Sequence, residues 1–195
     1  MERYIPGTTL EYVDAAKNNA FSLIEPVLKA TGGLTLSQLS TLTGLGGTTV
    51  QNWIKRGWVA SATGKKYSEK QVLRILLINM LRDSMKLDEI AHLMAYVNGD
   101  VDDSSDDIIA DIHLYNMLCR IIFTAEDNGA FAPDALRALI DSEMSQHTAE
   151  IANTDKLRKA LFVMVLGYHS GRLKRIMDRD LVVILEEENA GSYGK

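Results

Sequence analysis

Apolar residues recur along this chain at intervals of three and four, the spacing that places them on one face of an α-helix. The first two such stripes are Leu36, Leu39 and Leu42, and then Val50, Trp53 and Ile54. Between them lies Gly44, and glycine reaches the left-handed backbone angles that end a helix without a steric penalty. The pattern from Leu34 onward therefore predicts a helix, a tight turn and a second helix over 48–56.

The later stripes predict that the rest of the chain is also helical. A helix that begins at Ser68 is apolar on nearly every side, so we expect it to be buried. The other helices are expected over 11–18, 21–30, 88–97 with Asp88 as its cap, 108–125, 134–146 and 154–179. Residues 181–185 fit either a strand or another helical turn, and 186–195 fit a polar tail that frays. The sequence predicts a mainly α fold.

Breaks in this pattern divide the chain into four parts. We expect an N-terminal helical arm over 1–33, a compact unit over 34–97 and a helical bundle over 108–195. Between the last two, 98–107 is rich in aspartate, which is typical of a solvated linker. Its glycine stands second rather than sixth, so the spacing does not match a calcium-binding EF-hand loop.

The polar residues of the helix over 48–56 lie off its apolar stripe. Gln and Asn can form two hydrogen bonds with a base edge, and Lys and Arg can neutralise phosphates. The residues of these kinds are Gln51, Asn52, Lys55 and Arg56. A loop or small hairpin over 60–67 follows and carries Lys65 and Lys66 beside Tyr67. This combination is typical of a recognition helix followed by a wing.

Charge is distributed unevenly along the chain. The whole sequence has a formal net charge of −5, yet residues 34–86 contain eight basic and two acidic residues, a local charge of +6. Residues 87–150 contain two basic and fourteen acidic residues, a local charge of −12. Because the basic excess coincides with the predicted recognition helix and wing, it favours a partner that carries phosphates.

Several short motifs occur in an order that resembles a known family. They are Leu39, Thr43-Gly44, Thr49-Val50, Lys55-Arg56-Gly57-Trp58-Val59, Lys66-Tyr67-Ser68 and Leu87-Asp88-Glu89-Ile90. Together they resemble the winged helix-turn-helix of MerR-type transcription regulators, and more closely a bacterial domain-of-unknown-function family numbered 1836. The resemblance implies a MerR-like winged helix-turn-helix over 34–97, with a small wing hairpin over 60–67, ahead of the helical bundle.

The resemblance also implies a function. We expect a bacterial transcription regulator that binds double-stranded DNA as a homodimer in the cytoplasm. Gln51 and Asn52 would contact bases in the major groove. The residues expected to grip phosphates or to support the wing are Thr48, Thr49, Lys55, Arg56, Lys65, Lys66 and Tyr67. The bundle over 108–195 would dimerise or sense a small-molecule effector of unknown identity.

Two departures from the MerR pattern limit what the resemblance implies. That family usually has an arginine followed by two aromatic residues on the recognition helix, where this chain has Gln51, Asn52 and Trp53. It also follows this domain with a long dimerising helix, where this chain has the acidic stretch over 98–107. The dimer geometry and the promoter mechanism are therefore not carried over.

No sequence motif supports an enzyme, a metal site or a bound cofactor. The four histidines, His92, His113, His147 and His169, include no pair at the close spacing of a zinc motif. The single Cys119 fits a reducing compartment, and the longest apolar run, 160–168, is far short of a membrane span. The N-terminus has no pattern of an export signal. We expect no catalytic residues, no cofactor, no metal and no membrane contact.

The main alternative is a protein-interaction module, because the same fold with a few surface lysines can bind a protein without binding DNA. An effector pocket in the bundle would be lined from Tyr115, Met117, Phe123, Met164, Tyr168 and His169. Such a stripe of methionine and aromatic residues also fits a packed core.

Overall fold

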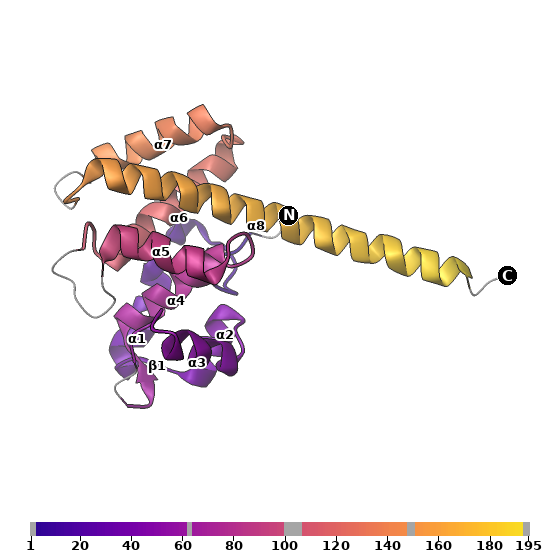
Figure 1. Ribbon diagram of the computed structural model, residues 1–195, viewed down its shortest axis with the longest axis horizontal. Coiled ribbons are helices and arrows are strands. Elements are labelled where there is room, and N and C mark those ends of the chain that lie inside the picture. The colour runs from indigo at the N-terminus through magenta and orange to yellow at the C-terminus, as the bar shows by residue number, and fades with distance from the viewer. Residues whose placement is uncertain (1–2, 62–63, 100–106, 148–150, 193–195) are drawn as a thin grey trace.

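A computed structural model of the protein describes residues 3–61, 64–99, 107–147 and 151–192. Its elements, in chain order, are the 3₁₀ helices η1 (Asp14–Ala16) and η2 (Ala20–Leu23), then α1 (Glu25–Thr31), β1 (Leu34–Thr35), α2 (Leu36–Thr43), α3 (Gly47–Lys55), β2 (Lys66–Tyr67), α4 (Glu69–Leu81), α5 (Leu87–Asn98), α6 (Asp111–Asn128), α7 (Pro133–Ser145) and α8 (Thr154–Ser192). The prediction of a mainly α fold is confirmed. Figure 1 shows α3 and β1 at one end of the body and α7 at the other.

The first two apolar stripes form α2 and α3, joined by a short turn. A capping box begins α2: the backbone N–H of Gln38 donates to Thr35 Oγ1 at 3.3 Å, and that of Thr35 donates to Gln38 Oε1 at 2.9 Å. The helix ends at Gly44, whose φ of +70° is the left-handed conformation that glycine adopts at low cost. Leu39 of α2 and Trp53 of α3 are both buried, and the polar residues of α3 are exposed.

The two short strands pair with each other across a long stretch of sequence. Leu34 pairs with Tyr67 and Thr35 with Lys66, in antiparallel register. The small hairpin expected within 60–67 is not formed by the described residues, because the partner of β2 precedes α2; residues 62–63 lie outside the described ranges. Gly33 permits this approach, since its φ is +117° and a Cβ there would lie 2.6 Å from the Tyr67 carbonyl oxygen.

α4 is the central helix of the molecule. Ser68 caps it through a second capping box with Gln71, and nearly all of its residues are buried, as the apolar pattern predicted. It packs against α2 and α5 on the N-terminal side of the chain and against α6 and α8 on the C-terminal side. The buried apolar residues therefore form one cluster that extends from Ile5 to Tyr168.

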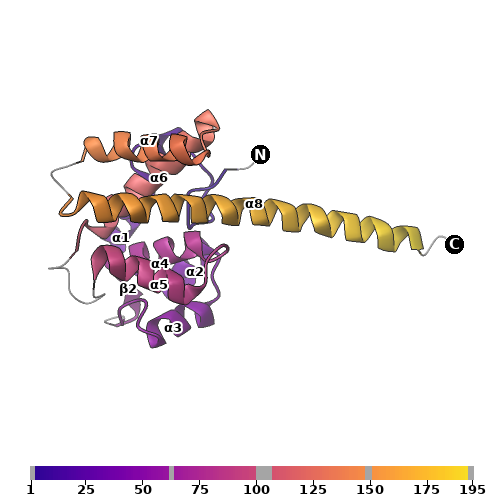
Figure 2. The ribbon, with the colours of Figure 1, turned by 45° about the horizontal axis from the view of Figure 1, so that its top comes forward.

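The C-terminal helices lie over α4, with α8 between α5 and α7 in both views (Figures 1 and 2). α7 begins at Pro133, a residue that fits the first turn of a helix because its missing N–H has no partner there. Gly167 and Gly171 allow α8 to approach the end of α4: a Cβ on Gly167 would lie 3.3 Å from Met85 Sδ, and one on Gly171 would lie 3.2 Å from Asp83 Cβ.

Several predicted boundaries were wrong. α8 continues to Ser192, so the helical alternative for 181–185 is confirmed, the strand alternative is wrong, and no frayed tail forms at 186–192. α5 has Lys86 rather than Asp88 at its N-cap, and the backbone N–H of Lys86 donates to Glu89 Oε2 at 3.0 Å. α6 begins at Asp111 instead of 108, so Asp111 supplies the acidic group in its first turn. The arm forms η1, η2 and α1 instead of two helices.

Candidate nucleic-acid interface

α3 has one buried face and one exposed polar face. Val50 and Trp53 are 0% and 2% exposed and fix the helix to the body. The exposed side chains of the helix and of the residue that follows it are Thr48, Gln51, Asn52, Lys55 and Arg56. Figures 1 and 2 place α3 at the end of the body farthest from α7. The polar residues that the sequence proposed as DNA contacts therefore lie together on an accessible surface.

A groove of about 780 Å³ lies between α3 and the start of α5. Its lining residues are Thr49, Asn52, Trp53, Lys55, Arg56, Trp58, Lys86, Leu87 and Asp88. Three of these are basic and one is acidic, so the groove is cationic. Four of the predicted site residues meet here, together with Lys86, which the sequence analysis did not select. Its place depends on where the start of α5 lies relative to α3, and no local sequence pattern indicates that arrangement.

The rim of the groove is held by Arg56, Trp58 and Arg74. The Arg56 guanidinium carbon lies 5.1 Å from the centre of the Trp58 ring, a cation–π arrangement. Arg74 Nε donates to the Trp58 carbonyl oxygen at 3.3 Å. Burial lowers the pKa of the Arg74 guanidinium, and the carboxylates of Asp111 and Asp107 oppose that shift. Sequence reasoning missed Arg74 because it lies in an otherwise apolar helix.

The predicted wing residues are arranged differently from the groove residues. Lys65 and Lys66 are exposed, but neither lines the groove. Lys66 Nζ donates to the backbone carbonyl of Thr31, which ties β2 to the end of α1. Tyr67 is 6% exposed, and burial raises the pKa of its hydroxyl. The Tyr67 ring therefore supports the strand pair and is not available to contact a ligand.

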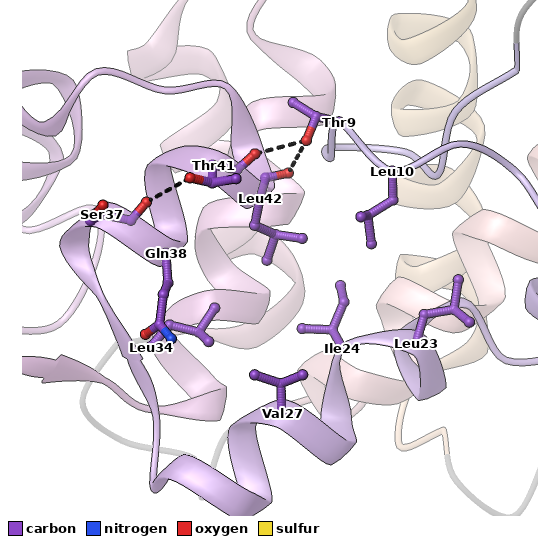
Figure 3. A pocket seen from close by; sticks show the side chains of 10 residues that line it. All are labelled: Thr9, Leu10, Leu23, Ile24, Val27, Leu34, Ser37, Gln38, Thr41 and Leu42. Atoms are coloured by element: carbon purple, nitrogen blue, oxygen red, sulfur yellow. Dashed lines mark hydrogen bonds between the residues drawn. The ribbon is translucent and has the colours of Figure 1, made fainter.

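A separate apolar hollow of about 350 Å³ lies between α2 and the arm (Figure 3). Its aliphatic lining residues are Leu10, Leu23, Ile24, Val27, Leu34 and Leu42, and its polar ones are Thr9, Ser37, Gln38 and Thr41. Thr9 Oγ1 donates to the Thr41 carbonyl at 2.8 Å, which holds the arm against α2. Such a lining suits an apolar group and not a phosphate.

The residues considered for an effector pocket mostly fill the core. Tyr115, Met117, Phe123 and Met164 are each 0% exposed. His169 is half-buried and stacks on Phe131, with ring centres 3.6 Å apart.

Tyr168, the last of these residues, borders a hollow of about 400 Å³. That hollow also contains Arg3 and Arg172, and Glu126 accepts a salt bridge from each, at 2.6 and 3.3 Å. Two further arginines line the hollow, Arg175 and Arg179, and they pair with Asp83 and Asp180. Each of its four arginines thus forms an ion pair with a carboxylate.

Two other kinds of site were sought in the described part of the chain. Within residues 3–61, 64–99, 107–147 and 151–192, no three or more His, Cys, Asp or Glu residues are grouped to hold a metal ion. Nor does any helix in these ranges combine the length and the apolar character needed to cross a bilayer.

Comparison with known proteins gives a family but no activity. Residues 21–118 match the family described as "Domain of unknown function (DUF1836)", which confirms the predicted family number. The "Uncharacterized protein YkrK" of Bacillus subtilis (strain 168) is 27% identical over 144 residues, which cover 68% of this chain and 61% of that protein. The chain thus spans only about three fifths of this relative. No solved structure matches the chain.

Proposed function

The chain belongs to the DUF1836 family, and we propose that it is a DNA-binding transcription regulator of MerR-like type that places α3 in the major groove. The family is one of unknown function, so the proposal rests on the site itself. The observation that carries it is the exposed face of α3, on which Gln51, Asn52, Lys55 and Arg56 lie together beside Lys86. Base-reading amides flanked by phosphate-neutralising cations are the combination that a recognition helix needs.

Size and electrostatics support this assignment. A helix with its side chains is about 10–12 Å across, and the major groove of B-DNA is about 12 Å wide. Because α3 lies at an end of the body, a duplex can approach it without meeting the C-terminal helices (Figure 2). The local charge of +6 over 34–86 would attract the duplex, although the whole chain is at −5.

Each part of the site has a role in the proposed complex. Gln51 and Asn52 would form hydrogen bonds with base edges. The groove between α3 and α5 would receive the sugar–phosphate backbone, with Lys55, Arg56 and Lys86 as its cationic contacts. The side chains expected to hold phosphates elsewhere are Thr48, Thr49, Lys65 and Lys66. Tyr67 would act indirectly by fixing β2.

The first test is fluorescence anisotropy of labelled duplex DNA at several salt concentrations. The wild-type protein is compared with a variant in which Lys55, Arg56, Lys65 and Lys66 are alanine. If these side chains hold phosphates, the variant loses affinity, and its slope of log K against log salt falls by roughly 3 to 4.

A control variant carries the same change of charge elsewhere. Its four alanines replace Lys17, Arg137, Lys156 and Lys159, all exposed and outside the proposed interface. Equal losses in the two variants would show that only net charge matters, and absence of binding at low salt would overturn the proposal.

Sequence selectivity has its own test. Replacing Gln51 or Asn52 with alanine should reduce discrimination between a selected site and random DNA by about 1–3 kcal/mol each. The salt slope should not change, because neither side chain carries charge.

A second candidate function is supported by the apolar hollow beside α2. A protein-interaction module would use this surface (Figure 3) to receive an apolar group, for which its aliphatic lining is suited. This function predicts that Val27→Glu, a change at a side chain 48% exposed, abolishes partner binding and leaves DNA affinity unchanged.

The proposed regulator would act where the DNA is, in the cytoplasm of a bacterial cell. One α3 contacts only a short half-site, so we also propose that two copies bind together. A small-molecule effector stays a hypothesis, because the aromatic residues considered for it are packed in the core.

A further inference from the structure

The last part of α8 carries large apolar side chains that the body does not cover. We name residues 173–192 the α8 tail; both views show it leaving the body (Figures 1 and 2). Its apolar side chains, 48% to 58% exposed, are Leu173, Met177, Leu181, Val182, Val183, Ile184 and Leu185. In the first half of the same helix, Leu157, Leu161 and Met164 are fully buried. The tail thus has the apolar content of a buried helix, but no other part of the described chain covers these side chains.

Helix propensity gives an independent reason to expect a partner. Val182, Val183 and Ile184 are β-branched, and such residues lose side-chain freedom in a helix. In proteins, most helical stability comes from packing of an apolar face and not from propensity. A run of three β-branched residues in a projecting helix is therefore best stabilised by contact with another surface.

The apolar residues define the face that needs covering. Leu173, Met177, Leu181 and Ile184 follow one another at intervals of four, four and three, so they lie on one side of the helix. With 1.5 Å of rise per residue, the twenty-residue tail is about 30 Å long. A second helix of similar length would cover this stripe along its whole extent.

The distribution of charge along the tail indicates which helix pairs with it and in which direction that helix runs. Residues 173–179 of the tail contain three basic residues and one acidic residue, while 180–188 contain four acidic residues and no basic one. The side chains of Lys174 and Arg179 are 55% and 66% exposed, and each pairs with a carboxylate of the same helix, Asp178 and Asp180 respectively. Exposed pairs of this kind contribute little to stability, so they can be exchanged for pairs with another chain. An antiparallel copy of the same segment would set the basic half of each tail against the acidic half of the other. A parallel copy would set like charges together.

We infer that the α8 tail pairs antiparallel with the α8 tail of a second copy of this chain. The pair buries the apolar stripe of both helices and matches their opposite charges. The inference deepens the proposed function, on which it rests for its biological role: it supplies the contact that brings two α3 helices to one DNA site.

Sedimentation velocity over a range of protein concentrations tests the pairing without DNA. The wild type should dimerise, and the double variant Met177→Glu with Ile184→Glu should weaken dimerisation at least tenfold. Both side chains are more than half exposed, so neither change disturbs the core. The matched control is Val13→Glu with Val163→Glu, at side chains 45% and 42% exposed, and it should dimerise like the wild type. A monomeric wild type, or equal weakening in the control, would overturn the inference.

Disulfide trapping tests the direction. In an antiparallel pair centred near residue 180, position 173 of one copy lies near position 187 of the other. A chain with both Leu173→Cys and Glu187→Cys should become covalently dimeric on mild oxidation, and Leu173→Cys alone should not. Linkage by the single variant would show parallel pairing and refute the antiparallel assignment. The native Cys119 does not compete, because it is fully buried.

The two hypotheses fail separately. A chain that dimerises but shows no salt-sensitive DNA binding would remove the proposed function and leave the tail pairing intact. A chain that binds DNA as a monomer would remove the tail pairing and leave the proposed function intact.

Discussion

Replacement of Gly33 with alanine tests whether the contact between β1 and β2 depends on close backbone approach. The φ of Gly33 is +117°, a conformation that residues with a Cβ rarely adopt, and the new Cβ would lie 2.6 Å from the Tyr67 carbonyl oxygen. Backbone strain of this kind costs about 1–3 kcal/mol. The clash can be relieved only by displacing β2, and that displacement adds a further destabilisation. We expect a total of about 3 kcal/mol or more.

The neighbouring Gly32 provides the control. Its φ is +68°, but no atom lies within 4 Å of the position of its Cβ. Gly32→Ala should therefore cost only the left-handed penalty of roughly 1 kcal/mol. For a chain of this size each kcal/mol lowers Tm by about 2–4 °C, so Gly33→Ala should lower Tm by about 6–12 °C and Gly32→Ala by about 2–4 °C.

Thermal unfolding followed by tryptophan fluorescence is a suitable assay, because Trp53 and Trp58 both lie close to this strand pair in the chain. The reasoning would be refuted if the two variants lost the same amount of stability. In that case the close approach at Gly33 would contribute nothing beyond its backbone angle. A DNA-binding assay on the folded Gly33→Ala variant would then report whether displacement of Lys66 matters.

Two further predictions concern ionisable groups, the half-buried His169 and the fully buried Cys119. Burial lowers the pKa of His169 below its ordinary value of 6.5. The unfolded chain therefore binds this proton more readily than the folded chain does. The contribution of neutral His169 to the free energy of unfolding is complete above pH 6.5 and is lost as the pH falls below that value. His169→Phe, which keeps an aromatic ring against Phe131, should remove this part of the pH dependence in denaturant titrations, and an unchanged profile would contradict the assignment. Burial also raises the pKa of the Cys119 thiol, and the side chain is fully buried, so a thiol-specific reagent should label native protein at least about 10³-fold more slowly than unfolded protein. Rapid labelling of native protein would show that α6 opens readily.

Local patterns in the sequence predicted the elements that local forces determine. The helix boundary at Gly44 and the buried helix after Ser68 follow from residues within a few positions of each other. The outward face of α3 follows from the apolar stripe of the same helix. These features needed no knowledge of distant contacts.

Features that depend on distant contacts were not predicted. β1 and β2 are each two residues long, too short for a periodic signal, and their partners lie far apart in the sequence. Lys86 lines the groove only because the fold brings the start of α5 close to α3. The length of α8 was missed because a run such as 181–185, apolar on every side, has the same periodicity in a buried strand as in a helix.

The position of α4 has a consequence for how this protein can be divided. Since α4 packs on both α2 and α6, the surface that supports the candidate DNA-binding helices is completed by residues from the second half of the chain. A fragment that ended after α5 would expose the side of α4 that α6 and α8 cover. The N-terminal unit is therefore not a separable module that gene fusion could transfer intact, and a rearrangement of the C-terminal helices would reach α3 through α4 and α2.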